Sequence, residues 1–152
     1  MKMTHSDKAA ELFKEGYTCA QAVLLAFSDI TGIDEETASK IALSFGGGMG
    51  RLREVCGTVS GALMTAGLLW APSGKPPYDA KAKHYELVQE IAKRFKEKNG
   101  SIICRELLGL NHKTDPPVPE KRTEDYYKRR PCEKYVRISA EIIEQLINEK
   151  SV

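Results

Sequence analysis

Apolar residues recur at helical spacing along almost the whole of this 152-residue chain, and no stretch of useful length alternates apolar and polar residues as a strand would. Glycine and proline pairs separate the helical stretches, and capping residues such as Thr18 and Asp34 precede two of them. The pattern predicts about six helices, at residues 6–13, 18–31, 34–45, 55–70, 78–98 and 132–147. We therefore expect an all-α fold, a helical bundle that forms a single domain over residues 1–152.

The four cysteines of the chain share an unusual position, because each falls where the local sequence predicts the start of a helix. They are Cys19, Cys56, Cys104 and Cys132. A helix N-terminus carries partial positive charge, which favours a thiolate over a thiol. A purely structural cysteine has no reason to prefer that position, so the pattern indicates redox or metal chemistry at these four residues.

Three interpretations of the cysteines stay open. They can be small buried hydrophobic residues, since free cysteine is often buried. They can be redox-active, with one thiolate attacking a disulfide or an oxidant and a second cysteine resolving the intermediate. They can also bind zinc or an iron–sulfur cluster, because soft thiolate ligands select these metals. Successive cysteines are 37, 48 and 28 residues apart and form no CxxC pair, so only the fold can bring them to a shared site.

A glycine-rich segment, residues 46–50, leads towards Cys56 and is followed by two arginines. One interpretation is a tight turn or a close approach to another element, which glycine permits. In the other, backbone N–H groups and the arginines hold an anion or support a thiolate. We predict this supporting role for Gly47, Gly48, Gly50, Arg51, Arg53 and Gly57. Among the four cysteines, Cys56 is then expected to have the lowest pKa, with Cys19 as its partner.

Residues 111–131 are polar and contain four prolines, so they predict a long irregular loop of the kind that often serves as a lid. Basic and aromatic side chains gather within residues 121–130, but acidic residues interrupt them. We therefore expect a solvated surface there and no nucleic-acid partner. An adaptor role, in which this loop recruits a protein partner, is a further alternative.

Composition narrows the function classes further. The net charge of +2 is too small to favour nucleic acid or an anionic membrane surface. Residues 55–71 carry no charge, but they number only 17 and include many small residues, so they predict a buried core helix and no membrane span. The polar start of the chain lacks the apolar core of a signal peptide, and a cytoplasmic location is expected.

The small residues of the predicted helix 55–70 form a face that can pack within the domain or against a second copy of the chain. Packing against a second copy would make the protein a homodimer.

The sequence around the cysteines resembles the C_GCAxxG_C_C family of redox-active proteins. The resemblance rests on GYTCAQAV at residues 16–23, GGGMG at 46–50 and CGTVSGA at 56–62, with two further lone cysteines after them. It spans about residues 9–147 and makes the family's four cysteines correspond to Cys19, Cys56, Cys104 and Cys132. One departure is Thr58, where the family motif has alanine, and it adds a hydroxyl near the Cys56 sulfur.

The resemblance implies a redox role for these four cysteines, for which thiol–disulfide chemistry is our first hypothesis. Metal or iron–sulfur binding by the same residues, without catalysis, is the alternative. Members of the family tend to lie beside transporter genes, which implies that they handle a small solute or a metal. The resemblance names neither the redox partner nor the solute.

Overall fold

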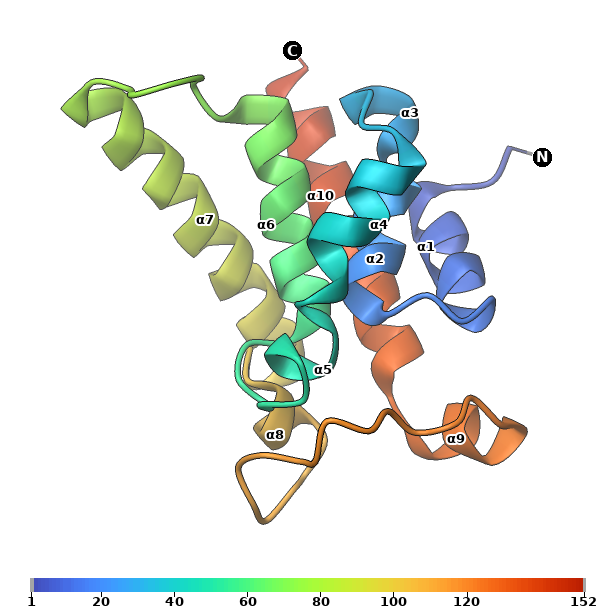
Figure 1. The fold of residues 1–152 in the computed structure, drawn as a ribbon. Coiled ribbons are helices and arrows are strands. Elements are labelled where there is room, and N and C mark those ends of the chain that lie inside the picture. The colour runs from blue at the N-terminus through green and yellow to red at the C-terminus, as the bar shows by residue number, and fades with distance from the viewer. Residues whose placement is uncertain (1, 152) are drawn as a thin grey trace.

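The computed structural model describes residues 2–151, and Figure 1 shows that this part of the chain is built of helices. Six of the helices are eight residues or longer: α1 (His5–Lys14), α2 (Cys19–Ala26), α4 (Glu35–Leu43), α6 (Gly57–Trp70), α7 (Tyr78–Asn99) and α10 (Cys132–Lys150). They correspond to the six helices that the sequence predicts, except that the predicted helix 18–31 is divided at Phe27 into α2 and a short second helix. Within residues 2–151 the single extended pairing is one antiparallel bridge between Val55 and Ile103, so the all-α class is confirmed.

Shorter elements raise the number of helices above the predicted six. They are α3 (Ser28–Thr31), α5 (Gly46–Met49), α8 (Cys104–Leu107) and α9 (Glu124–Arg129). Each is only four to six residues long, which is too short for apolar periodicity to reveal. The backbone of α5 is left-handed inside, and without it nine helices remain in the described range. The predicted irregular loop at 111–131 is wrong in part, because α9 lies within it.

Local capping sets where the main helices begin and end. The Thr18 hydroxyl accepts a hydrogen bond from the Gln21 N–H, and the Gln21 side chain accepts one from the Thr18 N–H, which together form a capping box at the start of α2. Asp34 caps α4 in the predicted way. Gly100 ends α7 in a left-handed conformation. The first helix begins slightly earlier than predicted because Thr4 is its cap.

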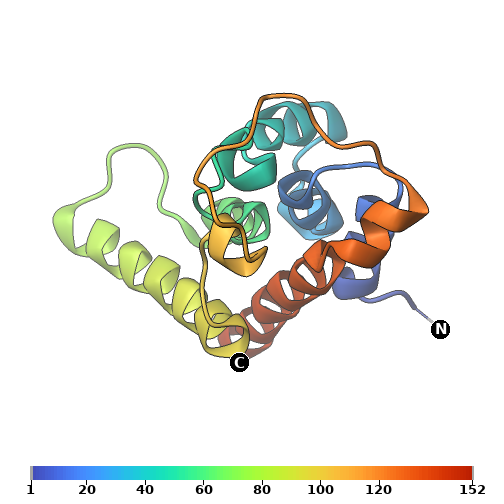
Figure 2. The ribbon, with the colours of Figure 1, turned by 90° about the horizontal axis from the view of Figure 1, so that it is seen from below.

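The core is centred on α2, in which seven of the eight residues are buried. Figures 1 and 2 show α1, α4, α6 and α10 arranged around it. Helices α2 and α6 approach closely because a Cβ at Gly61 would lie 2.7 Å from the Ala20 carbonyl oxygen and 3.0 Å from Val23 Cβ. The small-residue face of α6 is therefore occupied within the chain, and it no longer provides a reason to expect a second copy there.

The long helix α7 joins the bundle only near its C-terminal end. Ile91 and Phe95 are buried, whereas Leu87 and Val88, which the sequence also predicts in the buried stripe, are half-buried. Figure 2 shows the other end of α7 sloping away from the remaining helices. Among residues 2–151, no helix combines the length and the apolar character that crossing a membrane requires, and α6 is a core helix as predicted.

Candidate functional site

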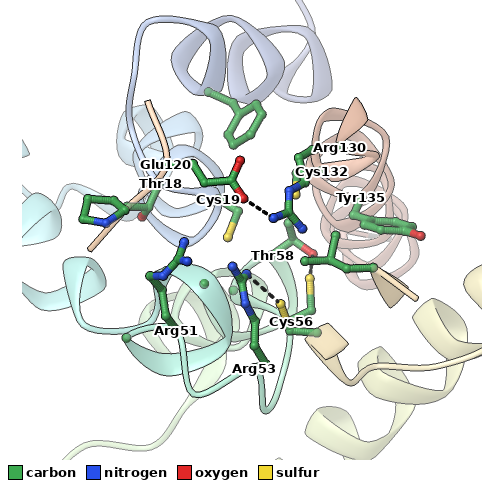
Figure 3. A pocket seen from close by; sticks show the side chains of 18 of the residues that line it. Thr18, Cys19, Arg51, Arg53, Cys56, Thr58, Glu120, Arg130, Cys132 and Tyr135 are labelled. Carbon is green, nitrogen blue, oxygen red and sulfur yellow. Dashed lines mark hydrogen bonds and ion pairs between the residues drawn. The ribbon is translucent and has the colours of Figure 1, made fainter. Parts of the chain in front are cut away.

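The prediction that each cysteine starts a helix is confirmed. Cys19, Cys104 and Cys132 are the first residues of α2, α8 and α10, and Cys56 is the N-cap of α6. All four line one cavity of about 290 Å³ at the end of the bundle where these helices begin. Figure 3 shows three of them, labelled, around this space. Residues that are 37, 48 and 28 positions apart in sequence are thus brought together by the fold.

The antiparallel bridge orders two of these cysteines. The Cys56 N–H donates to the Ile102 carbonyl oxygen at 2.8 Å, and the Cys104 N–H donates to the Glu54 carbonyl oxygen at 2.5 Å. Cys56 and Cys104 are consequently diagonal neighbours on one face of the bridge, the relation in which side chains on paired strands come within reach of each other. The bridge brings the segment before α6 and the segment before α8 to the same place.

Gly57 fixes the place of the third sulfur. A Cβ at this position would overlap Cys19 Sγ and would lie 2.8 Å from the Phe45 carbonyl oxygen. The Cys19 sulfur therefore lies against the first residue of α6, next to Cys56 in the chain. The predicted supporting role of Gly57 has a steric cause, because any side chain there would displace the sulfur.

The glycine-rich segment forms a left-handed coil. Residues 47–51 all have positive φ angles, between 64° and 72°, and they include the non-glycine residues Met49 and Arg51. Arg53 follows with a φ of 61°. A left-handed conformation costs roughly 1–2 kcal/mol for each residue that carries a Cβ. Such strain collects at functional sites, where the surrounding structure holds it in place.

The coil packs directly beneath the cysteines. A Cβ at Gly48 would lie 2.7 Å from Cys104 Cβ and 2.8 Å from Arg53 Cα, so only glycine fits there. The Gly47 N–H forms a hydrogen bond with the Cys19 sulfur that favours its thiolate. The two interpretations of the glycines are thus combined: the backbone turns tightly, and a backbone donor reaches a sulfur. Gly50 lines the cavity, and its left-handed conformation ends α5.

Arg53 supports a different cysteine from the one that the sequence predicts. Its side chain is buried, with 5 % of the residue exposed, and Nη1 donates to Cys104 Sγ at 3.6 Å. Its Nε donates to Asp115 Oδ2 at 2.7 Å. Burial opposes the charge of Arg53, but the hydrogen bonds to Cys104 and Asp115 outweigh it and raise the pKa of Arg53. The guanidinium therefore stays charged beside the Cys104 sulfur, where it stabilises negative charge.

The expectation that Cys56 has the lowest thiol pKa is wrong. Burial raises its pKa well above the ordinary range, and charge on Cys19 raises it further, while a 3.1 Å hydrogen bond with the Thr58 hydroxyl opposes the shift. Burial also raises the pKa of Cys19, against the hydrogen bond from Gly47, and raises that of Cys132 to about 12. A helix N-terminus supplies only partial charge, and here the loss of water around the sulfur outweighs it.

The other wall of the cavity comes from residues 117–132, so Arg122, Tyr126 and Arg130 line a cavity although residues 121–130 are predicted to form a solvated surface. The Arg122 guanidinium lies 4.4 Å from the centre of the Phe13 ring and 5.0 Å from that of Tyr126. It also donates to the carbonyl oxygens of Phe13 and Tyr17, at 3.0 and 3.1 Å. Arg130 is paired with Glu120. The basic and aromatic residues within 121–130 were visible in the sequence as a possible binding surface. Their spacing alone does not show that the side chains point into the cavity.

Metal ligation has less support from the arrangement. Over residues 2–151, no group of three or more histidine, cysteine, aspartate or glutamate side chains is placed so that it could hold a metal ion. The four cysteines line one cavity, yet their positions do not form a ligand set for zinc or an iron–sulfur cluster. His112 is a further candidate metal ligand, but its Nε2 forms a 2.7 Å hydrogen bond with Asp115 Oδ1.

Comparison with known proteins agrees with the resemblance seen in the sequence. A family model described as "Putative redox-active protein (C_GCAxxG_C_C)" matches residues 17–146. The chain belongs to this family. The matched region includes all four cysteines of the C_GCAxxG_C_C pattern and the left-handed coil between the first two. Neither the curated proteins nor the solved structures that were searched gave a match.

Proposed function

We propose that the protein carries out thiol–disulfide exchange in the four-cysteine cavity, with Cys104 as the attacking sulfur and Cys19 as the resolving sulfur. The observation that carries the proposal is that four cysteines from four separate helix starts line one cavity. Four unrelated core cysteines would have no reason to meet in this way. Membership of a family described as redox-active agrees with it.

Cys104 is assigned the first step because of its surroundings. Its sulfur accepts a hydrogen bond from the buried Arg53 guanidinium, whereas the Cys56 sulfur has the Thr58 hydroxyl as its partner. A nearby cation stabilises a thiolate more strongly than a neutral hydroxyl does. In addition, the burial that raises the thiol pKa of Cys56 and Cys132 favours their protonated forms at neutral pH.

Cys19 is assigned the second step. Burial raises its pKa, but the backbone hydrogen bonds from Gly47 and Ala20 and the charge of Arg122 act in the opposite direction and favour its thiolate. Cys19 and Cys104 lie against adjacent residues of the left-handed coil, Cys19 at the Gly47 N–H and Cys104 Cβ 2.7 Å from where a Cβ at Gly48 would lie, and charge on Cys104 raises the Cys19 pKa further. Once Cys104 has formed a mixed disulfide, that repulsion is gone and the Cys19 thiolate forms more readily.

The exchange balances as two displacements on sulfur. The Cys104 thiolate attacks one sulfur of a disulfide R–S–S–R, the S–S bond breaks, and R–S⁻ leaves and takes up a proton. The Cys19 thiolate, having given its proton to solvent or to the leaving thiolate, then attacks the Cys104 sulfur and releases the second R–S⁻. Two electrons pass from the protein to the substrate, so the protein gains a Cys19–Cys104 disulfide and the substrate becomes two thiols. The reverse sequence oxidises two thiols.

The test is a redox titration of the fully reduced protein without oxygen, with free thiols counted and disulfide-linked peptides identified by mass spectrometry. We expect two thiols to disappear together in one reversible two-electron step that links Cys19 to Cys104. The Cys104→Ser variant should lose this step, and the matched Cys132→Ser variant should keep it. Thiols that stay unreactive towards excess disulfide, or stoichiometric zinc or iron in protein purified anaerobically, would overturn the proposal.

A further inference from the structure

The cavity that holds the cysteines also concentrates positive charge. Five charged side chains line it, and four of them are guanidinium groups: Arg51, Arg53, Glu120, Arg122 and Arg130. Asp115 lies behind them and pairs with Arg53. Two carboxylates thus face four cations, which leaves an excess of two positive charges around one small space. Figure 3 shows the side chains of Arg51, Arg53 and Arg130 directed towards the same space as the Cys19 sulfur.

Three of these four arginines are already engaged by the protein. Arg53 binds Asp115 and Cys104, Arg130 is paired with Glu120, and Arg122 donates to two backbone carbonyls. Arg51 differs from them. Its Nε donates to the Pro116 carbonyl oxygen at 2.7 Å, but the nearest carboxylate oxygen is 3.8 Å from Nη2, which is beyond hydrogen-bond distance.

The terminal nitrogens of Arg51 therefore have no hydrogen-bond acceptor among residues 2–151, although the side chain is only 18 % exposed. The residue also has a φ of 70°, a conformation that costs energy for any residue but glycine. Strained backbone of this kind clusters at active sites and at sites that hold ligands. Here the Arg51 guanidinium, which has a long 3.8 Å ion pair with Asp115 and no hydrogen-bond acceptor at its terminal nitrogens within the described part of the chain, lines the cavity.

Arg51 lies next to Arg53, the residue that donates to the sulfur that we assign the first step. Its Cγ would be 3.0 Å from a Cβ at Gly47, and Arg53 Nη1, which donates to Cys104 Sγ, would be 3.9 Å from the same point. Both side chains therefore pass over Gly47. Arg51, Arg53 and Cys104 all line the same cavity, so a ligand held by the terminal nitrogens of Arg51 shares that space with the Cys104 sulfur.

The rest of the lining sets the size and character of the ligand. A cavity of about 290 Å³ is at the small end of the range for small-molecule sites, which favours a small molecule over a segment of polypeptide. Much of the wall is apolar and includes Phe13, Leu43, Leu107, Leu108 and Pro119. The ligand is then expected to have a short apolar body and an anionic end.

We infer that the substrate of this cavity is a low-molecular-weight disulfide that carries a carboxylate, and that the terminal nitrogens of Arg51 bind the carboxylate. The inference rests on the proposed function, and it adds the substrate class. A guanidinium binds a carboxylate through two parallel hydrogen bonds, which fixes the orientation of the bound molecule as well as its position. The disulfide is then held for attack by the Cys104 thiolate, and the products are two thiols, one or both carrying the carboxylate.

The experiment compares three disulfides of similar size and different charge: dithiodiglycolate, bis(2-hydroxyethyl) disulfide and cystamine. The rate at which each oxidises the reduced protein is divided by its rate with a free small thiol, which removes intrinsic reactivity. We expect the dianion to react about tenfold faster than the neutral disulfide and the dication to be slowest, since local charge of one sign raises encounter rates by at least this factor. Added salt should reduce the differences.

The variant Arg51→Gln tests the residue. The ratio of the dianion rate to the neutral rate should fall about tenfold, close to one, while Arg51→Lys should keep part of it. Arg137→Gln is the matched control, because Arg137 pairs with Asp7 on another part of the bundle and should leave the ratio unchanged. The neutral disulfide reports on folding, since misfolding would change the exposure of the thiols and so the rate with the neutral disulfide as well.

The outcomes separate the two proposals. If the three disulfides oxidise the cysteines at equal normalised rates, or if Arg51→Gln leaves the ratio at its original value, the substrate inference is wrong and thiol–disulfide exchange stands. If none of the three disulfides oxidises the reduced protein, the proposed function fails, and the inference fails with it.

Discussion

The two ends of α6 are both reached through loops that contain left-handed glycines, and they are built in opposite ways. At the first end, Gly48 has a φ of 69°, and a Cβ on it would lie 2.7 Å from Cys104 Cβ. At the other end, Gly74 has a φ of 68°, and a Cβ on it would meet no atom within 4 Å. The same backbone conformation makes a simple turn at Gly74 and allows close packing against Cys104 at Gly48. A glycine in the sequence therefore does not by itself tell which of these it does.

The largest effect is expected from alanine at the two left-handed glycines. Both substitutions introduce left-handed strain of roughly 1–2 kcal/mol. In Gly48→Ala the new methyl also overlaps Cys104 and the backbone of Arg53, so we expect a total loss of about 3–4 kcal/mol in the free energy of unfolding. Gly74→Ala should lose only about 1 kcal/mol. Urea unfolding under reducing conditions measures both, and equal losses would show that the two loops do not differ.

The second pair of substitutions lies within α6 itself, one near each end. Gly57→Ala places a methyl group against Cys19 Sγ and the Phe45 carbonyl oxygen, and overpacking of this kind should cost about 2–3 kcal/mol. Gly67→Ala has open space around it and should stabilise the helix by about 0.5–1 kcal/mol. Thermal or urea unfolding of the two variants shows directly whether each substitution stabilises or destabilises the protein. The contrast fails if Gly57→Ala also stabilises the protein.

Arg53→Met removes the buried guanidinium at the cysteine end of α6. The loss of charged hydrogen bonds to Asp115 and Cys104 should cost about 2 kcal/mol at pH 7. The Arg53 hydrogen bond, followed by that of His112, holds the pKa of Asp115 below its ordinary value of 3.8. A carboxyl with a lowered folded pKa stabilises the protein above its unfolded pKa, and this contribution is lost as the pH falls through the folded pKa.

The difference in unfolding free energy between wild type and Arg53→Met should therefore shrink below pH 3.8, as measured by urea unfolding between pH 7 and 3. Lys40→Met is the matched control, because it removes an exposed i,i+4 ion pair and should change stability by at most about 0.5 kcal/mol. A difference that stays constant down to pH 3 would contradict the role given to Asp115.

The last effect appears only at alkaline pH, as a change in the slope of the unfolding free energy against pH. Burial, followed by charge on Cys19 and Cys104, raises the pKa of Cys132 from 9.0 to about 12. Because the pKa is raised, the folded state keeps a proton that the unfolded state loses between pH 9 and 12. The contribution of Cys132 to stability is therefore complete below pH 9 and is lost as the pH rises towards 12. Replacing Cys132 with alanine should make the fall in stability less steep by about 1.4 kcal/mol per pH unit. If the unfolding free energies of wild type and Cys132→Ala change in parallel between pH 9 and 11, burial does not raise the pKa of this thiol.

Local sequence was enough to predict the elements that bring each cysteine to the site. Thr18 and Gln21 are three residues apart and form their capping box within a single turn, so the start of α2 is visible in the sequence. The same is true of Asp34 before α4. The break at Phe27 between α2 and α3 and the short helix α9 could not be predicted, because packing sets them where periodicity gives no signal.

The partners of the sulfurs could not be predicted in the same way. Arg53 is three residues from Cys56, and proximity in sequence made Cys56 its expected partner. The bridge between Val55 and Ile103 instead brings in Cys104, whose sulfur is the one that Arg53 reaches. The basic and aromatic residues near position 122 show the same limit, because their inward direction depends on Phe13 from the other end of the chain.

The sequence by itself determined that the chain is helical and that every cysteine begins a helix, because capping, glycine stops and proline act over a few residues. Only the tertiary structure decided that the four helix starts share one cavity, that Arg53 reaches Cys104, and that the terminal nitrogens of Arg51 lack a hydrogen-bond acceptor there among the described residues. It also decided the thiol pKa values. Burial depends on everything that packs around a sulfur, and at Cys56 it outweighs the helix dipole that the sequence alone would have made decisive.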